Sequence, residues 1–327
     1  MMCTAFHMKT NDHYFGRNLD LDRSLGEEVC VIPRRYPLEF RRMGRQTEHY
    51  AMIGIATVMD GIPLLYDAAN EHGLAMAGLN FPGNAHYAPI MEGKDNVASF
   101  ELIPWILGQC RTVADAKDRL LRMNVADIAF SAAVPPAPLH WMICDREQAL
   151  VVEPMRDGLH IRENPAHVLT NNPPLPYQLE HLARYRRLRV DNAEVKREEG
   201  LPYDTYSQGL GAVGLPGDVS SSSRFVRMAF GLEHAVSPTD EAASVGQFFH
   251  LLSSVSMVRG LCRTDAATWE ITIYSSCINT DRGLYYYTTY GNRCITCVDM
   301  HRTDLNGVSF IRYPLLTQEM IREQQPG

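Results

Sequence analysis

The sequence predicts an α+β fold built in two or more layers. Segments with the composition of β-strands gather near both ends of the chain, amphipathic helices lie between them, and no repeat or Gly/Ser linker divides the 327 residues. A chain of this length forms either two domains or one large mixed domain. Strands at both ends with paired helices between them favour sheets covered by helices.

The predicted strands are short runs of aliphatic, Tyr and Thr residues, which suit a pleated and half-buried surface. They cover residues 3–7, 13–18, 51–58, 63–68, 74–78, 139–144, 149–153, 270–275, 284–290, 295–300 and 309–313. The first two of these strands carry the residues on which the functional prediction depends.

Helices are predicted in the remaining periodic segments. Residues 100–109 have apolar spacing, with Pro104 in the first turn, where a proline is tolerated. Residues 223–232 and 240–255 are typical of two amphipathic helices.

A further helix is expected to begin at Thr112. This residue is a favourable N-cap, and Asp115 then places an acidic group in the first turn. We expect Leu120 and Leu121 to lie on one face of this helix.

Residues 184–217 look less regular than the rest of the chain. A basic run that starts at Arg184 is followed by acidic residues and by the Gly-rich stretch QGLGAVGLPGD. Charge runs are usually solvated, and a long excursion of this kind is also suited to an arm that makes oligomer contacts.

Composition excludes several classes of partner. The formal charge of −7 disfavours general attraction to nucleic acid or anionic lipid. The N-terminus has polar residues every few positions and does not read as a secretory signal, and no stretch approaches the ~18 apolar residues of a membrane span. We therefore expect a cytoplasmic protein with no nucleic-acid or membrane partner.

Its 8 cysteines are too dilute for a disulfide scaffold and should be mostly free thiols, of which Cys110 and Cys144 are packing residues.

Cys3 is the most informative residue for chemistry. If processing exposes it as the first residue, its own α-amine, with an ordinary pKa near ~8, can accept the thiol proton. No separate histidine is then required, and none of the 12 histidines stands in a convincing dyad with a cysteine.

Arg17 and Asp20 are the groups that such a centre needs nearby. A guanidinium stabilises a thiolate, and a carboxylate orients the α-amine by accepting its hydrogen bonds. Positions three apart on an ideal strand point to opposite faces. We therefore expect the strand to end or bend near Asn18.

A series of motifs then resembles the choloylglycine hydrolase family, most closely its bile salt hydrolases. In chain order the motifs are MCTA at 2–5, FGRNLD at 15–20, NEHGL at 70–74, AGLNFP at 77–82, LHWM at 139–142, LTNNP at 169–173, GLPGD at 214–218, SRF at 223–225 and YYY at 285–287. Each motif alone is modestly specific, whereas their joint order over nearly the whole chain is highly specific.

This resemblance implies a single domain over residues 3–327, folded as a four-layer αββα sandwich of the N-terminal-nucleophile hydrolase type. It also implies a homotetramer. The catalytic residues that it implies are Cys3 as nucleophile, Arg17 beside the thiol, Asp20 at the α-amine, Asn80 and Asn171 at the oxyanion and substrate, and Arg224 as a second active-site arginine. The substrate-binding residues that it implies are Leu19, Met59, Tyr66, Phe130 and Asn80.

The function that follows from the resemblance is hydrolysis of the amide bond of glycine- or taurine-conjugated bile salts through a Cys3 thioester, with no metal or organic cofactor. The alternative within the family is an acylase for penicillin V or acyl-homoserine lactones. The chain begins Met1-Met2-Cys3, where the family usually begins Met-Cys. We therefore expect residues 1–2 to be absent from the mature protein.

Three other interpretations of the function have weaker support. Cys294 and Cys297 form a C-x-x-C pair, a pattern that can indicate a metal or redox site. No second Cys or His pair stands at zinc spacing. A papain-like role for Cys110 lacks any local signature. A non-catalytic binding protein would be inactive toward all amides even with Cys3 correctly exposed.

Overall fold

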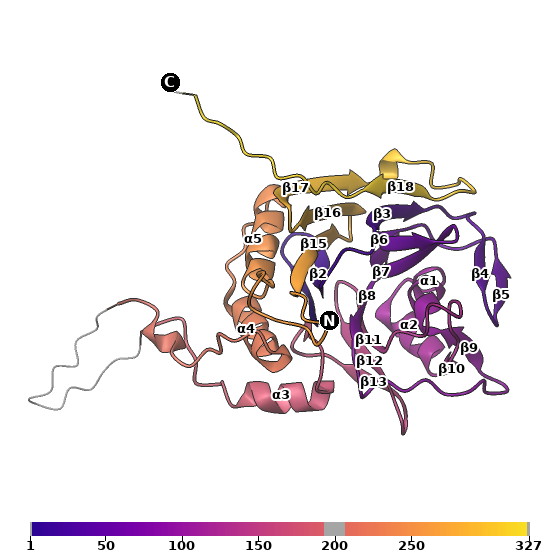
Figure 1. Cartoon of the computed structure of the whole chain (residues 1–327), viewed down its shortest axis with the longest axis horizontal. Helices are drawn as coiled ribbons and strands as arrows, with labels where there is room; N and C mark the ends of the chain where they lie inside the picture. Colours follow the sequence, from indigo (N-terminus) through magenta and orange to yellow (C-terminus); the bar gives the residue numbers. More distant parts are fainter. Residues whose placement is uncertain (1, 193–206, 326–327) are drawn as a thin grey trace, which may run out of the picture.

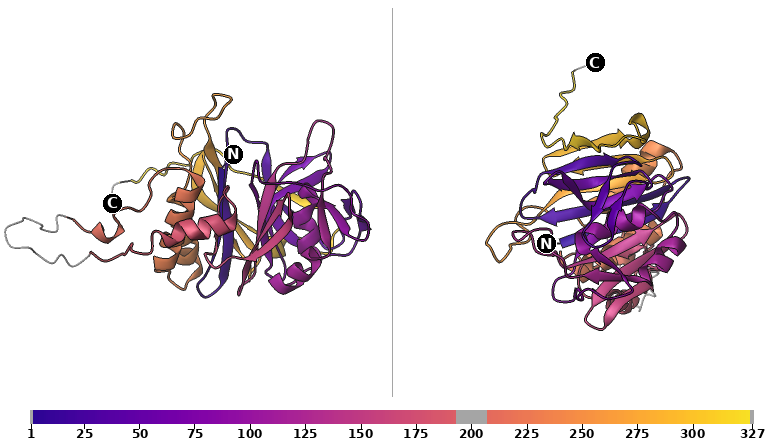
Figure 2. Two further views of the ribbon diagram at one scale, coloured as in Figure 1. Left: turned by 90° about the horizontal axis from the view of Figure 1, so that it is seen from below. Right: turned by 90° about the vertical axis from the view of Figure 1, so that its right-hand side faces the viewer.

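Two antiparallel sheets face each other, and helices cover the outer face of each. The computed structural model describes residues 2–192 and 207–325. Figure 2 (left) shows the four layers edge-on, with α3, α4 and α5 on one side of the two sheets and α1 and α2 on the other. The predicted α+β class is confirmed.

The first sheet carries the N-terminus. Its strands, in spatial order, are β14 (Val168–Leu169), β1 (Met2–Lys9), β2 (His13–Leu21), β15 (Ile271–Asn279), β16 (Leu284–Thr289) and β17 (Asn292–Asp299). Segments from both ends of the chain therefore meet in one sheet, because β2 pairs with β15 (Figure 1).

The second sheet has eight strands. In spatial order they are β13 (Gly158–Glu163), β12 (Ala149–Met155), β11 (Leu139–Cys144), β8 (Ala75–Asn80), β7 (Ile62–Asn70), β6 (Met52–Met59), β3 (Glu27–Ile32) and β18 (Ile311–Pro314). Two small ribbons flank it, β4 (Leu38–Phe40) with β5 (Gly44–Gln46), and β9 (Asp95–Ala98) with β10 (Met123–Ala126).

Five α-helices complete the described layers. The first sheet is covered by α4 (Ser221–His234) and α5 (Glu241–Ser253), with α3 (Leu175–Ala183) packed against α4. The second sheet is covered by α1 (Leu102–Leu107), and α2 (Val113–Leu120) packs against β10. Short 3₁₀ turns lie at Ser99–Glu101, Leu210–Ala212 and Met300–Arg302.

Strand β2 lies at the centre of the sandwich, and all nine of its residues are buried. The first sheet therefore has no solvent-facing side here, which suits a strand that must hold charged groups out of water. Gly16 is required at its position, since a Cβ there would lie 1.9 Å from the carbonyl oxygen of Ser276.

All eleven predicted strands and all four predicted helices are present, with ends shifted by a few residues. The N-cap prediction is confirmed, because the Thr112 side chain accepts a hydrogen bond from the Asp115 amide. The prediction for Leu121 is wrong: Leu120 is buried, whereas Leu121 lies beyond the helix end and is 60% exposed.

Residues 184–192 and 207–217 contain only turns and the short 3₁₀ turn, in agreement with the irregular segment predicted there. The remainder of that segment, 193–206, lies outside the described residues. No helix in the described part of the chain is long and apolar enough to cross a membrane.

Candidate active site

Cys3 lies on β1 at one end of a cavity of about 420 Å³ between the two sheets. The cavity walls are mainly aliphatic and aromatic, and the Cys3 side chain is 2% exposed. The predicted residues Arg17, Leu19, Met59, Tyr66, Asn80 and Phe130 all line this cavity with Cys3. Folding thus brings together residues spread over more than a hundred positions.

Arg17 occupies the same face of the first sheet as the thiol. In the β1–β2 pairing Cys3 lies opposite Leu19 and Ala5 opposite Arg17, so these side chains point toward the second sheet. Arg17 Nη1 donates to the carbonyl oxygens of Gly78 at 2.6 Å and Tyr66 at 3.2 Å. These bonds fix the guanidinium at the cavity wall.

The electrostatics of Arg17 depend on its anionic neighbours. Burial alone would lower the pKa of this guanidinium, but the negative charges available on Cys3, Tyr274 and Asp67 outweigh burial and raise that pKa. Arg17 therefore keeps a fixed positive charge in the wall of the cavity that Cys3 also lines.

Asn171 and Arg224 hold the backbone of Cys3. The Cys3 backbone nitrogen donates to Asn171 Oδ1 at 2.8 Å, and Arg224 Nη2 donates to the same oxygen at 2.8 Å. Arg224 Nη1 also donates to the Cys3 carbonyl oxygen at 2.5 Å and to Thr4 Oγ1 at 2.6 Å. Asn171 Nδ2 donates to the carbonyl oxygen of Asn80 at 2.7 Å. One fully buried arginine and one amide therefore fix the position of Cys3.

Asp20 lies on the opposite face of the sheet from Arg17. It shares a face with Asn18, two residues away, whose side chain donates to the Leu252 carbonyl oxygen in α5, so both face the helices. Asp20 Oδ1 accepts from Thr272 Oγ1 at 2.6 Å. Burial raises the pKa of Asp20 to about 6, and the charge of Arg224 partly opposes this shift.

The expected bend at Asn18 is wrong, because β2 continues without a break to Leu21. The register shift in the pairing of β2 with β15 lies in β15, between Thr272 and Tyr274. No bend is needed, since the backbone nitrogen of Cys3 lies in the plane of the sheet and is approachable from either face. A thiol contact on one face and an amine contact on the other are compatible with a regular strand.

Two polar features of the site were not predicted. The Thr57 and Tyr66 hydroxyls hydrogen-bond at 2.9 Å in the mainly apolar wall of the cavity. Behind Arg17, buried Asp67 accepts hydrogen bonds from the hydroxyls of Tyr274, at 2.6 Å, and Tyr285. An aspartate between Tyr66 and Ala68 in a largely apolar strand was the available signal for the second feature.

Known proteins with similar sequences cover almost the whole chain. The sequence profile of the linear amide C–N hydrolases, choloylglycine hydrolase family, matches residues 3–313. The bile salt hydrolase/transferase of Lactiplantibacillus plantarum is 45% identical, with 97% of this chain and 98% of the relative covered. That of Clostridium perfringens is 35% identical, with 94% of each covered.

Solved structures give the same relationship. A crystal structure of the conjugated bile acid hydrolase from Clostridium perfringens matches with a TM-score of 0.93 at 33% identity, covering 99% of this chain and 100% of the other. A penicillin V acylase from Agrobacterium tumefaciens shares the fold, with a TM-score of 0.74 at 20% identity over 98% and 95% of the two chains. The four-layer αββα sandwich of the N-terminal-nucleophile type is thereby confirmed, and the chain belongs to the choloylglycine hydrolase family of linear amide C–N hydrolases.

Proposed function

We propose that this enzyme hydrolyses the amide bond that joins a bile acid to glycine or taurine. The observation that carries the proposal is the position of Cys3, whose backbone is fixed by Asn171 and Arg224 at the end of a largely apolar cavity. The names of the relatives at 45% and 35% identity support the same substrate class.

The mature enzyme is proposed to comprise residues 3–327 as one domain, with residues 1 and 2 removed. Met2 lies opposite Asp20 in the β1–β2 pairing. Its removal would free the α-amine of Cys3 beside that carboxylate, with Asn171 Oδ1 already within hydrogen-bonding distance of the same nitrogen. Two acceptors would then hold the ammonium hydrogens in fixed directions.

The reaction has two halves joined by a covalent intermediate. The α-amine takes the thiol proton, and the Cys3 thiolate, next to the Arg17 guanidinium, attacks the substrate carbonyl carbon. The tetrahedral oxyanion accepts hydrogen bonds from the amide groups of Asn171 and Asn80. Asn171 Nδ2 uses one hydrogen on the Asn80 carbonyl oxygen, which leaves its second hydrogen for this role.

Collapse of the tetrahedral intermediate breaks the C–N bond. The α-ammonium gives its proton to the departing glycine or taurine nitrogen, which leaves a bile-acyl thioester on Cys3. Water then loses a proton to the free α-amine and attacks the thioester carbonyl. The products are the free bile acid and the regenerated thiol.

The cavity suits a large, rigid and mostly apolar acyl group. Its lining includes Leu19, Met59 and Phe130, with the Thr57–Tyr66 hydroxyl pair as a localised polar position. Apolar walls with a few placed polar groups are the usual design of a specific small-molecule site. We assign this pair to the hydroxyl groups of the steroid.

The decisive experiment compares glycocholate, taurocholate and penicillin V as substrates, following release of the amine. We expect release from one or both bile salts to exceed turnover of penicillin V. Preferred turnover of penicillin V or of an acyl-homoserine lactone would replace the proposal with the acylase alternative.

The role of Cys3 is tested by Cys3→Ser, which should keep the fold but lose most activity, because a hydroxyl ionises far less readily than a thiol. The matched control is the exposed Cys294→Ser, which should retain activity. Intact mass of the active wild-type enzyme must show Cys3 as the first residue, and an active chain that retains Met2 would refute the α-amine mechanism.

We further propose that the enzyme acts in the cytoplasm as a homotetramer, with the segment around 184–217 contributing to subunit contacts. The described parts of this segment extend away from the two sheets (Figures 1 and 2). Light scattering of the purified enzyme should give four times the 36.9 kDa chain mass.

A further inference from the structure

A second group of reactive side chains lies between the sheets, away from the active site. Cys3 and His7 both lie on β1 and face the second sheet. They are four positions apart, or about 13 Å along an extended strand. The ligand atoms of His7, His13 and Cys144 all lie within 4.8 Å of one another. The sequence-based expectation of a plain packing role for Cys144, with no histidine beside it, is therefore incomplete.

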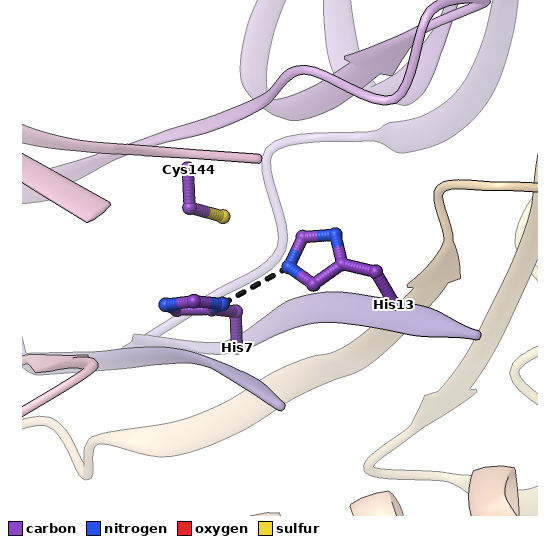
Figure 3. A group of neighbouring side chains, drawn as sticks. All are labelled: His7, His13 and Cys144. Atoms are coloured by element: carbon purple, nitrogen blue, oxygen red, sulfur yellow. Dashed lines mark hydrogen bonds between the residues drawn. The ribbon is translucent and has the colours of Figure 1, made fainter. Parts of the chain in front are cut away.

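Figure 3 shows how the three side chains converge. His7 comes from β1, His13 from β2 and Cys144 from the facing sheet, and the sulfur points toward the two rings. His7 Nδ1 and His13 Nε2 face each other at 3.0 Å. All three residues are buried, with exposed fractions of 6%, 0% and 0%.

The hydrogen-bond partners of His13 define its free lone pair. Thr280 Oγ1 donates to the His13 carbonyl oxygen at 3.2 Å, and it lies 2.7 Å from His13 Nδ1. Since its one hydrogen is used, Thr280 Oγ1 accepts from Nδ1–H. His13 Nε2 is then unprotonated and directs its lone pair at the other two groups.

His7 is held in the same manner from its far side. Its Nε2 lies 2.7 Å from Nδ1 of His167. When the His7 proton is on Nε2, it is donated to His167, and His7 Nδ1 has a lone pair for a metal ion. A metal-bound histidine usually has its second nitrogen fixed by a partner. Both imidazoles already have that arrangement.

A metal ion requires each ring to direct an unprotonated nitrogen at it, and the contacts with Thr280 and His167 occupy the opposite nitrogen of each ring. In a three-coordinate site with bond lengths of about 2.0–2.3 Å, the ligand atoms lie about 3.5–4.0 Å apart. The present separations therefore require only small movements.

We propose that His7 Nδ1, His13 Nε2 and Cys144 Sγ form a three-coordinate site for the soft monovalent cation Cu⁺. Among the described residues the group offers three ligand atoms, one thiolate and two imidazoles, a set that suits Cu⁺. Zn²⁺ prefers four ligands.

Charge favours the same ion. Cu⁺ with one thiolate is neutral overall, whereas Zn²⁺ would leave a net positive charge between the sheets, where burial of charge is costly. Arg146 and Lys9 add positive potential at His13, and Asp145 opposes it at His7. Binding of Cu⁺ releases one proton to solvent, that of the Cys144 thiol. The histidines lose no proton, because their protons only move between the nitrogens of His7 and His167.

The test uses full-length protein in which the other thiols that are exposed or reactive have been replaced. The background carries Cys3→Ser, Cys262→Ser, Cys294→Ser and Cys297→Ser. Cu⁺ is supplied anaerobically as its bicinchoninate complex, and transfer to the protein is followed by loss of the complex's absorbance. We expect one Cu⁺ per chain, and an X-ray absorption spectrum with one sulfur and two nitrogen ligands.

Variants of the site give the second readout. Cys144→Ala should abolish Cu⁺ transfer, whereas the matched control Cys277→Ala, a thiol equally buried in β15, should retain it. Thr280→Val removes the acceptor for His13 Nδ1–H and should weaken Cu⁺ affinity about tenfold.

Three results would overturn the proposal: no Cu⁺ uptake by the background protein, uptake that survives Cys144→Ala, or stoichiometric Zn²⁺ binding without Cu⁺ binding. If Cys144→Ala does not fold, the X-ray absorption spectrum of the Cu⁺-loaded background protein tests whether one sulfur binds the metal. A first shell with no sulfur, or with more than one, would then refute the site.

Discussion

Asn171→Asp separates the two tasks that the proposed mechanism assigns to one side chain. The Asn171 carboxamide oxygen accepts from the Cys3 nitrogen and from Arg224, both at 2.8 Å, while Nδ2 donates to the Asn80 carbonyl oxygen at 2.7 Å. Aspartate is nearly the same size and keeps the oxygen acceptor. It lacks both Nδ2 hydrogens, so the donor function is lost, and the negative charge that it adds lies against the Arg224 guanidinium.

The magnitude follows from what those two hydrogens do. Loss of one oxyanion donor typically lowers kcat by about 10²–10³, or about 3–4 kcal/mol. The donor acts on the tetrahedral intermediate rather than on bound substrate, so kcat and kcat/KM should fall by the same factor. The Asn80 carbonyl oxygen also loses its partner, which should cost about 1–3 kcal/mol of folding free energy.

The assay measures kcat and KM for glycocholate together with urea unfolding. Asn172→Asp is the matched control, because the neighbouring amide donates to the Pro82 carbonyl oxygen at 2.6 Å and has no described contact with Cys3 or Arg224. The hydrogen bond of the control is exposed to water, so this variant should lose less stability and keep kcat within about twofold of wild type. Wild-type kcat in Asn171→Asp, or equal losses in the two variants, would refute the proposed donor role.

Three further outcomes follow from the site. Thr57→Val leaves Tyr66 without its hydroxyl partner. For two bile salts that differ by one steroid hydroxyl, the ratio of their kcat/KM values should change by about 2–10-fold. An unchanged ratio would show that the hydroxyl pair has no role in substrate recognition. Asp67→Asn should lower the free energy of unfolding by about 1–3 kcal/mol, and by more than Tyr285→Phe does, because the amide cannot accept from both phenols with its two atoms. Since the pKa of Asp20 is raised to about 6, its ionised form is lost as pH falls through that value, so kcat/KM should fall below about pH 6; a flat profile from pH 7 to 5 would show that the Asp20 charge is not needed.

Sequence patterns predicted the positions of the strands and helices along the chain, and the family resemblance predicted the residues on the cavity side of the site. Leu19, Met59, Tyr66 and Phe130 line the cavity as expected, although their contact with substrate stays a prediction. Alternation within a strand predicted that Arg17 and Asp20 lie on opposite faces, and this prediction is confirmed.

Features that depend on how the layers stack were not accessible. The bend expected at Asn18 came from treating the strand alone, without the backbone nitrogen that both faces share. The approach of Cys144 to His7 requires the register between two facing sheets, which no local pattern encodes. Leu121 was misplaced because α2 ends one residue earlier than its apolar pattern suggested.

The two faces of strand β1 divide the enzyme into separable halves. Groups that hold the Cys3 carbonyl and the Thr4 side chain approach from the helix side, whereas the cavity wall lies on the other side and is built largely from the second sheet and its loops. Substitutions in β6, β7 or the 130–137 loop can therefore reshape the acyl site while Arg224 and its contacts stay unchanged. A family built on this plan can diversify its substrates without redesigning its nucleophile, and the cavity wall is the place to begin when engineering a new specificity.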